Sequence, residues 1–234
     1  GYRELVLTGI EISSWGHDLK NGESLIDLLE AVSAAAGDMR LRLGSLEPRT
    51  INEDFCRRAS KLPNLCPHFH LSLQSGCDET LRRMNRKYVT LLRQYFHRPA
   101  VTTDLICGFP DETNREFEQT MAFIEKCAFA DMHIFPYSVR PGTKAAELVQ
   151  FSAAVKEERT RRAVALARTM HRAYLEGCVG QTYPVLYEQE KDGLYTGHAP
   201  NYCEVCVRAE DLQNKNIDTK IVGIDGDALI GELT

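Results

Sequence analysis

The stretch "HFHLSLQ", residues 68–74, alternates polar with apolar side chains, and this alternation indicates what kind of sheet the chain forms. The polar members are His68, His70, Ser72 and Gln74, and the apolar members are Phe69, Leu71 and Leu73. Successive side chains of a strand point to opposite faces, so the pattern predicts a strand with one polar and one apolar face. The apolar face suits packing beneath helices. The polar face must then line a space that is wet or occupied.

Similar strand-like segments recur on both sides of this stretch, and each precedes a helical pattern. They are "ELVLTG" (4–9), "MRLRLGSLEP" (39–48), "AVTTDLICGFP" (100–110) and "DMHIFPYS" (131–138), the last followed by a long helix from about Ala153 to Glu176. Strands that alternate with helices predict an α/β fold with a parallel sheet. Central strands of a doubly wound sheet read as nearly continuous apolar runs, whereas these alternate. We therefore predict a partial parallel barrel with a ligand-holding interior and its function at the carboxyl ends of the strands.

The pattern changes after Gly180. The segments "TYPVLYEQ", "LYTGHAPNYCEVCVR" and "TKIVGIDGDALIGEL" alternate like strands and are separated by Gly, Asn and Asp turns without a helix. This predicts a small all-β barrel over residues 180–234, after a first unit over residues 1–179. A chain of 234 residues is long enough for one domain and a small module.

Composition limits the classes of protein that remain. The net charge of -5 gives no global signature of nucleic-acid binding, and no apolar stretch approaches the ~20 residues that span a bilayer. Eight irregularly spaced cysteines and the lack of a visible signal peptide predict a cytoplasmic protein with mostly buried thiols. Cys203 and Cys206 form a CxxC within a strand pattern, where they face opposite ways and do not chelate one metal. The chain begins without Met on a strand already under way, so we expect a piece of a larger protein.

His68 and His70 are the first candidates for metal ligands. An HxH pair on a barrel strand can bind zinc, with His133 and Asp104 as further ligands, and this pattern would suit a metal-dependent barrel hydrolase. Both histidines, however, lie at the start of their predicted strand, away from the end where barrel chemistry occurs. We expect them to be hydrogen-bonded interior side chains that hold no metal.

The carboxyl ends of the predicted strands collect small polar residues and glycines. Gln74, Ser75 and Gly76 offer an amide, a hydroxyl and an unencumbered backbone, which suit a polar small molecule. The alternative is a plain helix start with Ser75 or Asp78 as its cap. In "DLICGFPDET", Gly108 would let a ligand approach the backbone, Pro110 would stiffen the turn, and Glu112 could cap the next helix.

The long helix carries many arginines. Its apolar stripe is simplest to interpret as core, and the remaining surface is largely covered by Arg159, Arg161, Arg162, Arg168 and Arg172. A solvated helix face is the simpler interpretation, because Glu157 and Glu158 offset part of this charge. Contact with an RNA backbone is the functional alternative.

Five phrases of the sequence together resemble the radical S-adenosylmethionine methylthiotransferases. They are "LTGIEISSWGHDL", "LRLGSLEP", "CPHFHLSLQSGCDETLRRMNRKY", "AVTTDLICGFPDET" and "PYSVRPGTKAA". Within the family, "HFHLSLQSGCD" is close to the form of the MtaB-type branch, which acts on threonylcarbamoyladenosine in tRNA. The all-β tail resembles the TRAM module, an RNA-binding barrel. The resemblance extends from about Tyr2 to Leu233.

The resemblance implies a partial TIM-like barrel of the radical S-adenosylmethionine type, and it implies a reaction. In the family, a reduced iron–sulfur cluster splits S-adenosylmethionine, and the radical so formed abstracts hydrogen from the adenine ring of the tRNA. Sulfur and a methyl group are then installed there. The cofactor carries the difficult chemistry and the protein positions it. The implied cofactors are therefore S-adenosylmethionine and iron–sulfur clusters, the implied partner is tRNA, and neither a membrane nor a stable protein partner is expected.

The sequence departs from the family pattern in two places. The CxxxCxxC loop that holds the radical-generating cluster is absent, and we expect it before Gly1 in a longer protein. The chain alone is therefore expected to be inactive. The stretch from Arg86 to Phe96 is also shorter than is usual in the family, which affects how Arg86 is presented.

Carried over by position, the contacts to S-adenosylmethionine fall on residues at the strand ends, whereas no catalytic residue is assigned. They are Thr8, Gly9, Ser45, Glu47, Gln74, Ser75, Arg86, Asp104, Gly108, Phe109, Pro110, Ser138 and Arg140. Arg86 would pair with the methionine carboxylate, because a guanidinium binds a carboxylate in a two-pronged way. Two alternatives stay open beside the radical enzyme: the metal-dependent hydrolase using His68 and His70, and a non-catalytic RNA-binding protein.

Overall fold

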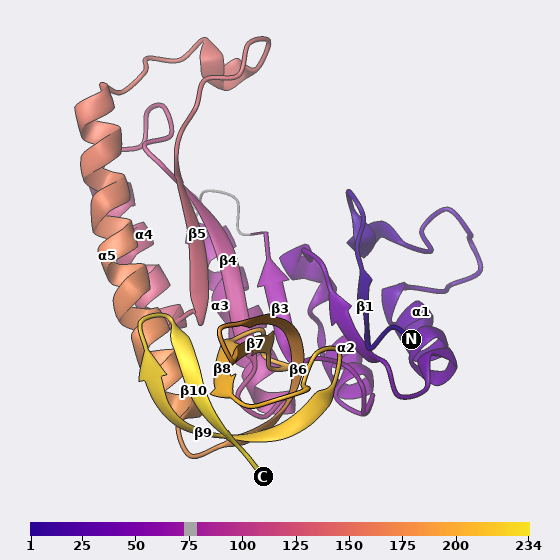
Figure 1. The fold of residues 1–234 in the computed structure, drawn as a ribbon. Helices are drawn as coiled ribbons and strands as arrows, with labels where there is room; N and C mark the ends of the chain where they lie inside the picture. The colour runs from indigo at the N-terminus through magenta and orange to yellow at the C-terminus, as the bar shows by residue number, and fades with distance from the viewer. Residues whose placement is uncertain (73–78) are drawn as a thin grey trace.

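The computed structural model describes residues 1–72 and 79–234, with two parallel sheets and a closed barrel of strands (Figure 1). The parallel strands are β1 (Glu4–Leu7), β2 (Arg40–Leu43), β3 (His68–Leu71), β4 (Ala100–Cys107) and β5 (Asp131–Pro136). β1 pairs with β2, and β3, β4 and β5 form the second sheet in that order. Isolated parallel bridges from Leu41 to Leu65 and from Leu46 to Leu71 join the β2 region to the β3 region. The predicted α/β fold with parallel sheets is confirmed.

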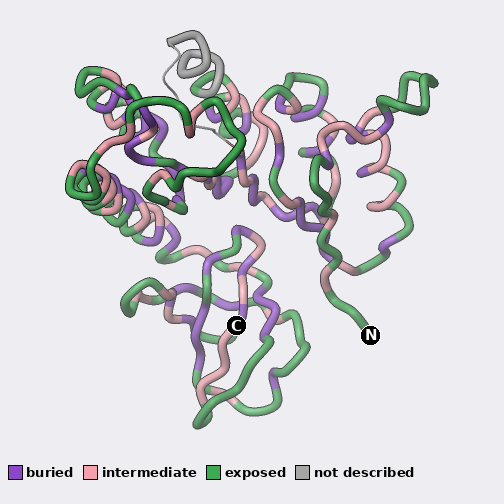
Figure 2. Tube along the Cα trace, turned by 90° about the horizontal axis from the view of Figure 1, so that it is seen from above, coloured by how far each residue is buried: buried purple, intermediate pink, exposed green. Residues whose placement is uncertain are grey.

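A helix follows each parallel strand. The helices are α1 (Leu25–Ala36), α2 (Glu53–Ala59), α3 (Glu79–Tyr95), α4 (Asn114–Cys127) and α5 (Ala153–Cys178), with short 3-10 turns at Ile12–Ser14, Pro48–Thr50 and Lys144–Ala146. They cover the apolar side of the strands, where Phe69 and Leu71 are fully buried. Buried residues follow the strands, whereas the segments before α1 and α5 are largely exposed (Figure 2). The pattern of "HFHLSLQ" thus assigns the apolar face correctly over its described part.

Local sequence signals explain where several helices begin. α1 and α4 each start with a capping box, in which Ser24 and Thr113 bond reciprocally with Asp27 and Glu116. Such a box satisfies backbone donors that the first turn of a helix leaves free. α3 is one continuous helix of 17 residues.

Glu112 and Arg159 differ from their predicted roles. Glu112 does not cap α4; its carboxylate is buried and lies 2.7 Å from Nη1 of Arg159, whose side chain is only 3% exposed. Arg159 therefore belongs to the interface between α5 and the loop after β4, and neither solvent nor RNA reaches it. The prediction of a solvated position for Arg159 is wrong because a carboxylate from another element neutralises it.

The last strands form a closed five-stranded barrel. They are β6 (Thr182–Lys191), β7 (Leu194–His198), β8 (Glu204–Arg208), β9 (Asn216–Asp225) and β10 (Ala228–Leu233), in the order β10-β8-β7-β6-β9. A second apolar core fills the barrel and includes Val185, Tyr187, Val205, Ile221 and Leu229. α5 joins the two parts, since Leu175 and Cys178 at its end are buried in this second core.

Candidate functional site on the polar face of the parallel sheet

The side of the parallel sheet away from the helices carries the polar residues of the strands. Strand pairing places His70 opposite Thr102, and Asp104 opposite His133. All four point to the same face, because their positions along the strands share one phase of the alternation. The polar face predicted from "HFHLSLQ" is therefore continued by the two neighbouring strands.

Asp104 lies between two histidines in the middle of this face. Its Oδ2 is 3.2 Å from Nε2 of His70, and its Oδ1 is 3.1 Å from Nδ1 of His133. Nδ1 of His70 lies 3.0 Å from the hydroxyl of Thr102. The side chain of His70 is 13% exposed, whereas those of Asp104 and His133 are 43% and 63% exposed. His70 is thus enclosed by the protein, whereas Asp104 and His133 are accessible to a ligand.

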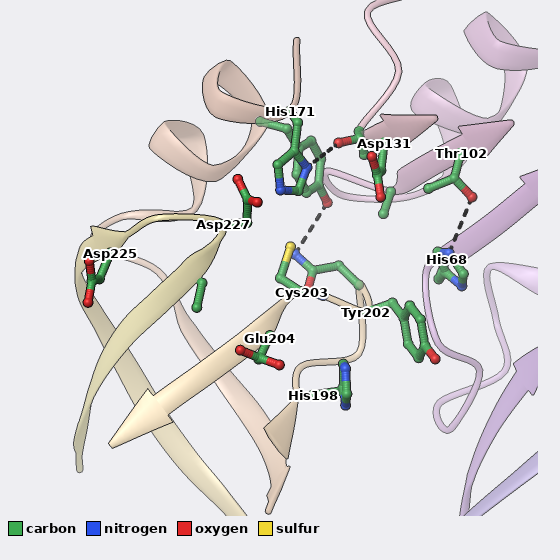
Figure 3. A pocket seen from close by; sticks show the side chains of 15 residues that line it. His68, Thr102, Asp131, His171, His198, Tyr202, Cys203, Glu204, Asp225 and Asp227 are labelled. Carbon is green, nitrogen blue, oxygen red and sulfur yellow. Dashed lines mark hydrogen bonds between the residues drawn. The ribbon is translucent and has the colours of Figure 1, made fainter. Parts of the chain in front are cut away.

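His68 lies on the same face as His70 and also contacts Thr102, but its other ring contact is to the barrel. Its Nε2 lies 3.4 Å from the hydroxyl of Thr102, and its ring stacks on Tyr202 of the barrel with centroids 5.0 Å apart (Figure 3). Burial, with further contributions from the charges of Arg42 and His70, lowers the pKa of His68 to about 3. His68 is therefore neutral at physiological pH and belongs to the contact between the sheet and the barrel.

The amino-terminal side of the polar face is covered by the loop between β7 and β8. Arg40 and Arg42 are buried, and both form ion pairs with Glu4. Nη1 of Arg40 also donates to the carbonyl oxygen of His198 at 2.9 Å, and Nη1 of Arg42 donates to that of Pro200 at 3.1 Å. Burial alone would raise the pKa of Glu4, but the hydrogen bonds and charges of the two arginines outweigh it and lower that pKa.

Tyr202 occupies the centre of this contact. Its ring lies between His68 and His198, and the guanidinium of Arg42 is 4.6 Å from the ring centroid. A cavity of about 450 Å³ lies beside it, bordered by the sheet, α5 and the barrel (Figure 3). The polar alternation of "RLRL" in β2 is therefore explained here by a docked barrel and not by a cofactor. Tyr202 was not among the residues predicted from the sequence, and the signal that could have pointed to a partner here is the pair of arginines within the short strand pattern "RLRL".

Most of the described residues that are expected to contact S-adenosylmethionine lie around the carboxyl ends of the parallel strands. Thr8, Gly9, Ser45, Ser138 and Arg140 are exposed there. Arg86 is exposed on α3, which follows β3. Gln74 and Ser75 lie outside the described residues. Because the carboxyl ends of parallel strands meet at one edge of a sheet, the exposed members share one side of the molecule.

Besides Asp104, four of the expected contact residues either contact other parts of the protein or are buried in it. The carboxylate of Glu47 pairs with Arg49, and the ring of Phe109 packs edge-on against Tyr137. Gly108 is buried with a φ of +72°, and a Cβ there would lie 2.9 Å from Cγ of Lys156. Pro110 is also buried. Gly108 and Pro110 thus shape the turn against α5, and the structure explains both without a ligand.

The described cysteines do not fit an iron–sulfur cluster. They are Cys56, Cys66, Cys107, Cys127, Cys178, Cys203 and Cys206, and all are buried and free. Among the described residues, the group of three potential metal ligands that converges is His70, Asp104 and His133, and it contains no thiol. A four-iron cluster requires convergent thiolates, so these residues do not provide its ligands.

The exposed strand ends fit S-adenosylmethionine in the chemistry of their donors. Hydroxyls of Thr8, Ser45 and Ser138 suit a ribose or an amino group, and the guanidinium of Arg140 suits a carboxylate. Gly9 leaves the backbone accessible, because a Cβ built there meets no atom closer than 4.0 Å. These features make the carboxyl edge of the sheet the candidate binding site for a polar small molecule.

Comparisons with known proteins identify relatives over nearly the whole chain. A threonylcarbamoyladenosine tRNA methylthiotransferase of Chlamydia pneumoniae is 35% identical, over 100% of this chain and 57% of the relative. The enzyme of that name from Thermotoga maritima is 40% identical over 63% of this chain and 36% of the relative. A tRNA-2-methylthio-N(6)-dimethylallyladenosine synthase of Chloroflexus aurantiacus is 35% identical over 94% of this chain and 50% of the relative. The chain spans about half the length of the curated relatives it matches, and no family model matches it.

A solved structure shares the fold. Coproporphyrinogen III oxidase (HemN) from Escherichia coli, described as a radical SAM enzyme, aligns with a TM-score of 0.54 at 12% identity, over 85% of this chain and 54% of that one. At this identity the likeness concerns the fold alone. Within the described residues, none of the helices combines the length and apolar character needed to cross a bilayer.

Proposed function

Because the chain is a homologue of the tRNA methylthiotransferases over most of its own length, we propose that it is part of an enzyme that adds a methylthio group to threonylcarbamoyladenosine in tRNA. The observation that supports this most is the parallel sheet with an exposed polar edge, in a chain whose relatives carry that activity in their names. Relatives named for dimethylallyladenosine match almost as well, so the modified base is the part of the proposal that most needs a test.

In this proposal residues 1–179 form a partial TIM-like barrel of the radical S-adenosylmethionine type, and residues 180–234 form a TRAM-like barrel. Strand–helix alternation up to α5 and a closed barrel after it support this division. The ligands of the iron–sulfur clusters then lie outside these 234 residues. S-adenosylmethionine, when bound with a reduced cluster, supplies the radical chemistry.

The roles of this chain are to bind and to orient. We keep the methionine carboxylate with Arg86, which is exposed on α3, and place the ribose near the hydroxyls of Thr8 and Ser45. Arg140, exposed after β5, is a second guanidinium for an anionic group. Gln74, Ser75 and Arg86 stay in the proposed set by position in the family pattern. The polar face between β3 and β5 then lies below the cofactor and faces the interior.

Charge distribution suggests which surface meets RNA. Residues 180–234 carry ten acidic and four basic side chains, a balance that opposes contact with phosphates. On α5, by contrast, Arg161 and Arg168 are exposed. We therefore assign contact with the RNA backbone to this face of α5. The barrel would help to place the substrate without contacting phosphates.

The test uses the longest protein that contains this chain, with its clusters reconstituted anaerobically. It is incubated with S-adenosylmethionine, a reductant and tRNA carrying threonylcarbamoyladenosine, and the digested nucleosides are analysed by mass spectrometry. The proposal expects the methylthio derivative, and tRNA carrying dimethylallyladenosine serves as the matched control. Product from the control alone would move the chain to the other branch. Binding of tRNA without modification of either would favour a non-catalytic RNA-binding protein.

A further inference from the structure

We propose that His70, Asp104 and His133 bind a late first-row divalent cation such as Zn²⁺ on the polar face of the sheet. The site would be separate from any iron–sulfur cluster, because no cysteine belongs to the group. It does not depend on the proposed function. It keeps His70, Asp104 and His133 of the set considered from the sequence and leaves out His68, so it departs from the expectation that His70 holds no metal.

The spacing of the ligand atoms suits such an ion. Zinc binds imidazole nitrogen and carboxylate oxygen at about 2.0–2.2 Å, so two ligands of a tetrahedral ion lie roughly 3.3 Å apart. The two distances from the Asp104 oxygens are 3.2 Å to Nε2 of His70 and 3.1 Å to Nδ1 of His133. Ligand atoms from all three residues lie within 4.8 Å of one another. The two short distances end on different oxygens of Asp104, so an ion bound between the two histidines would replace both hydrogen bonds.

The hydrogen bond of Thr102 prepares His70 for this role. Ligating histidines commonly use their second ring nitrogen for a hydrogen bond that fixes the ring. Here Nδ1 of His70 is 3.0 Å from the Thr102 hydroxyl, which leaves Nε2 directed at Asp104. Thr102 is therefore a positioning residue for the site.

The ligand set and its exposure define the kind of ion and its remaining ligands. Two imidazoles and one carboxylate favour zinc, cobalt or nickel over magnesium and calcium, which prefer oxygen ligands. The exposed sides of Asp104 and His133 leave room for water as the fourth ligand, an arrangement of catalytic and not of closed structural zinc sites. Asp104 lies three residues before Cys107, the last residue of β4, so the site is roughly 10 Å below the strand end.

The test titrates Co²⁺ and then Zn²⁺ into the chelator-treated chain under reducing conditions, without iron. We expect one ion per chain, cobalt bands of a four- or five-coordinate site, and an affinity lowered about tenfold or more by Asp104→Asn and by His133→Ala. Thr102→Val should lower it about 10- to 100-fold while all three ligands remain. His17→Ala, which removes an exposed histidine outside the group, is the matched control and should bind as the parent does.

Each other outcome rejects the site. Failure of the parent chain to bind one ion would overturn it, and so would binding that Asp104→Asn and His133→Ala leave unchanged. Intense sulfur-to-cobalt charge-transfer bands would place the ion on cysteines instead. Circular dichroism of each variant checks that its fold is intact. Because both substituted ligands are substantially exposed, loss of folding is not expected.

Discussion

Replacing Arg159 by Met should destabilise the sheet-containing part of the protein severely. Arg159 contributes three interactions that Met lacks: Nη1 lies 2.7 Å from Oε2 of Glu112, the same atom donates to the Glu112 carbonyl at 3.0 Å, and Nη2 donates to Asn114 at 3.0 Å. The side chains of Arg159 and Glu112 are only 3% and 4% exposed. Without the guanidinium, a carboxylate would stay buried with no cation beside it.

The expected loss is about 3–5 kcal/mol, the range for removing one partner of a buried ion pair. For a protein of this size that corresponds to a fall in Tm of roughly 10 °C. The double variant Arg159→Met/Glu112→Leu should recover most of this loss, because it removes the uncompensated charge. Arg162→Met is the control: its pair with Glu118 is exposed, so it should cost less than ~1 kcal/mol.

The single variant should also acquire a distinctive pH dependence. Burial already raises the pKa of Glu112 even though Arg159 opposes it, and loss of Arg159 must raise that pKa further. When the folded-state pKa is above the unfolded-state pKa, the folded protein binds more protons than the unfolded chain at pH values between those two pKa values. Stability of Arg159→Met should therefore increase as the pH is lowered from neutral toward the ordinary range of a glutamic acid.

Urea unfolding followed by the fluorescence of Trp15 measures these changes. Trp15 is the single tryptophan, and it packs against the core of the parallel sheets, so its signal reports on that part of the protein. If Arg159→Met costs no more than Arg162→Met, or if the double variant is less stable than the single one, the buried pair does not have the role described.

Three further predictions concern the barrel and the RNA surface. The pKa of Glu4 is lowered in the folded protein, so Glu4 stabilises the fold at pH values above its ordinary pKa. This stabilisation is lost as the pH falls through the folded-state pKa. Glu4→Gln should therefore abolish this acid sensitivity in a thermal melt. Tyr202→Ala should increase proteolysis of the chain between α5 and the barrel. Tyr202→Phe should not, because the ring and not the hydroxyl contacts Arg42. Equal cleavage of both variants would disprove this. Arg161→Glu with Arg168→Glu should weaken tRNA binding and flatten its salt dependence, and an unchanged slope of affinity against salt would exclude this face of α5 as a phosphate contact.

The residues that sequence reasoning placed correctly are those whose surroundings follow from local periodicity. The alternation of Phe69 and Leu71 with two histidines fixed which face of β3 packs under helices, because burial on one face imposes a period of two. After Gly180 the sequence changes to strand patterns without helices, and a closed barrel is found there. Strand–helix alternation was sufficient for the parallel sheets, since a parallel connection needs a crossover.

Contacts between distant segments could not be predicted in this way. Arg42 meets Tyr202 across 160 positions of the sequence, and nothing in "RLRL" specifies a barrel loop as its partner. Arg159 resembled its solvated neighbours because helical spacing does not reveal that Glu112 approaches from another element. Sequence reasoning named His133 and Asp104 beside the HxH pair, but it is the register of three strands that brings them to His70 and not to His68.

The most direct test of the account is hydrogen exchange of the reconstituted longer protein with and without S-adenosylmethionine, read by mass spectrometry. We expect protection at the carboxyl edge of the sheet, in peptides that cover residues 104–110 and 137–140. We expect no change in the loop at residues 198–204, which covers the opposite edge. Protection confined to the loop at 198–204, with the carboxyl edge unaffected, would contradict the placement of the cofactor site.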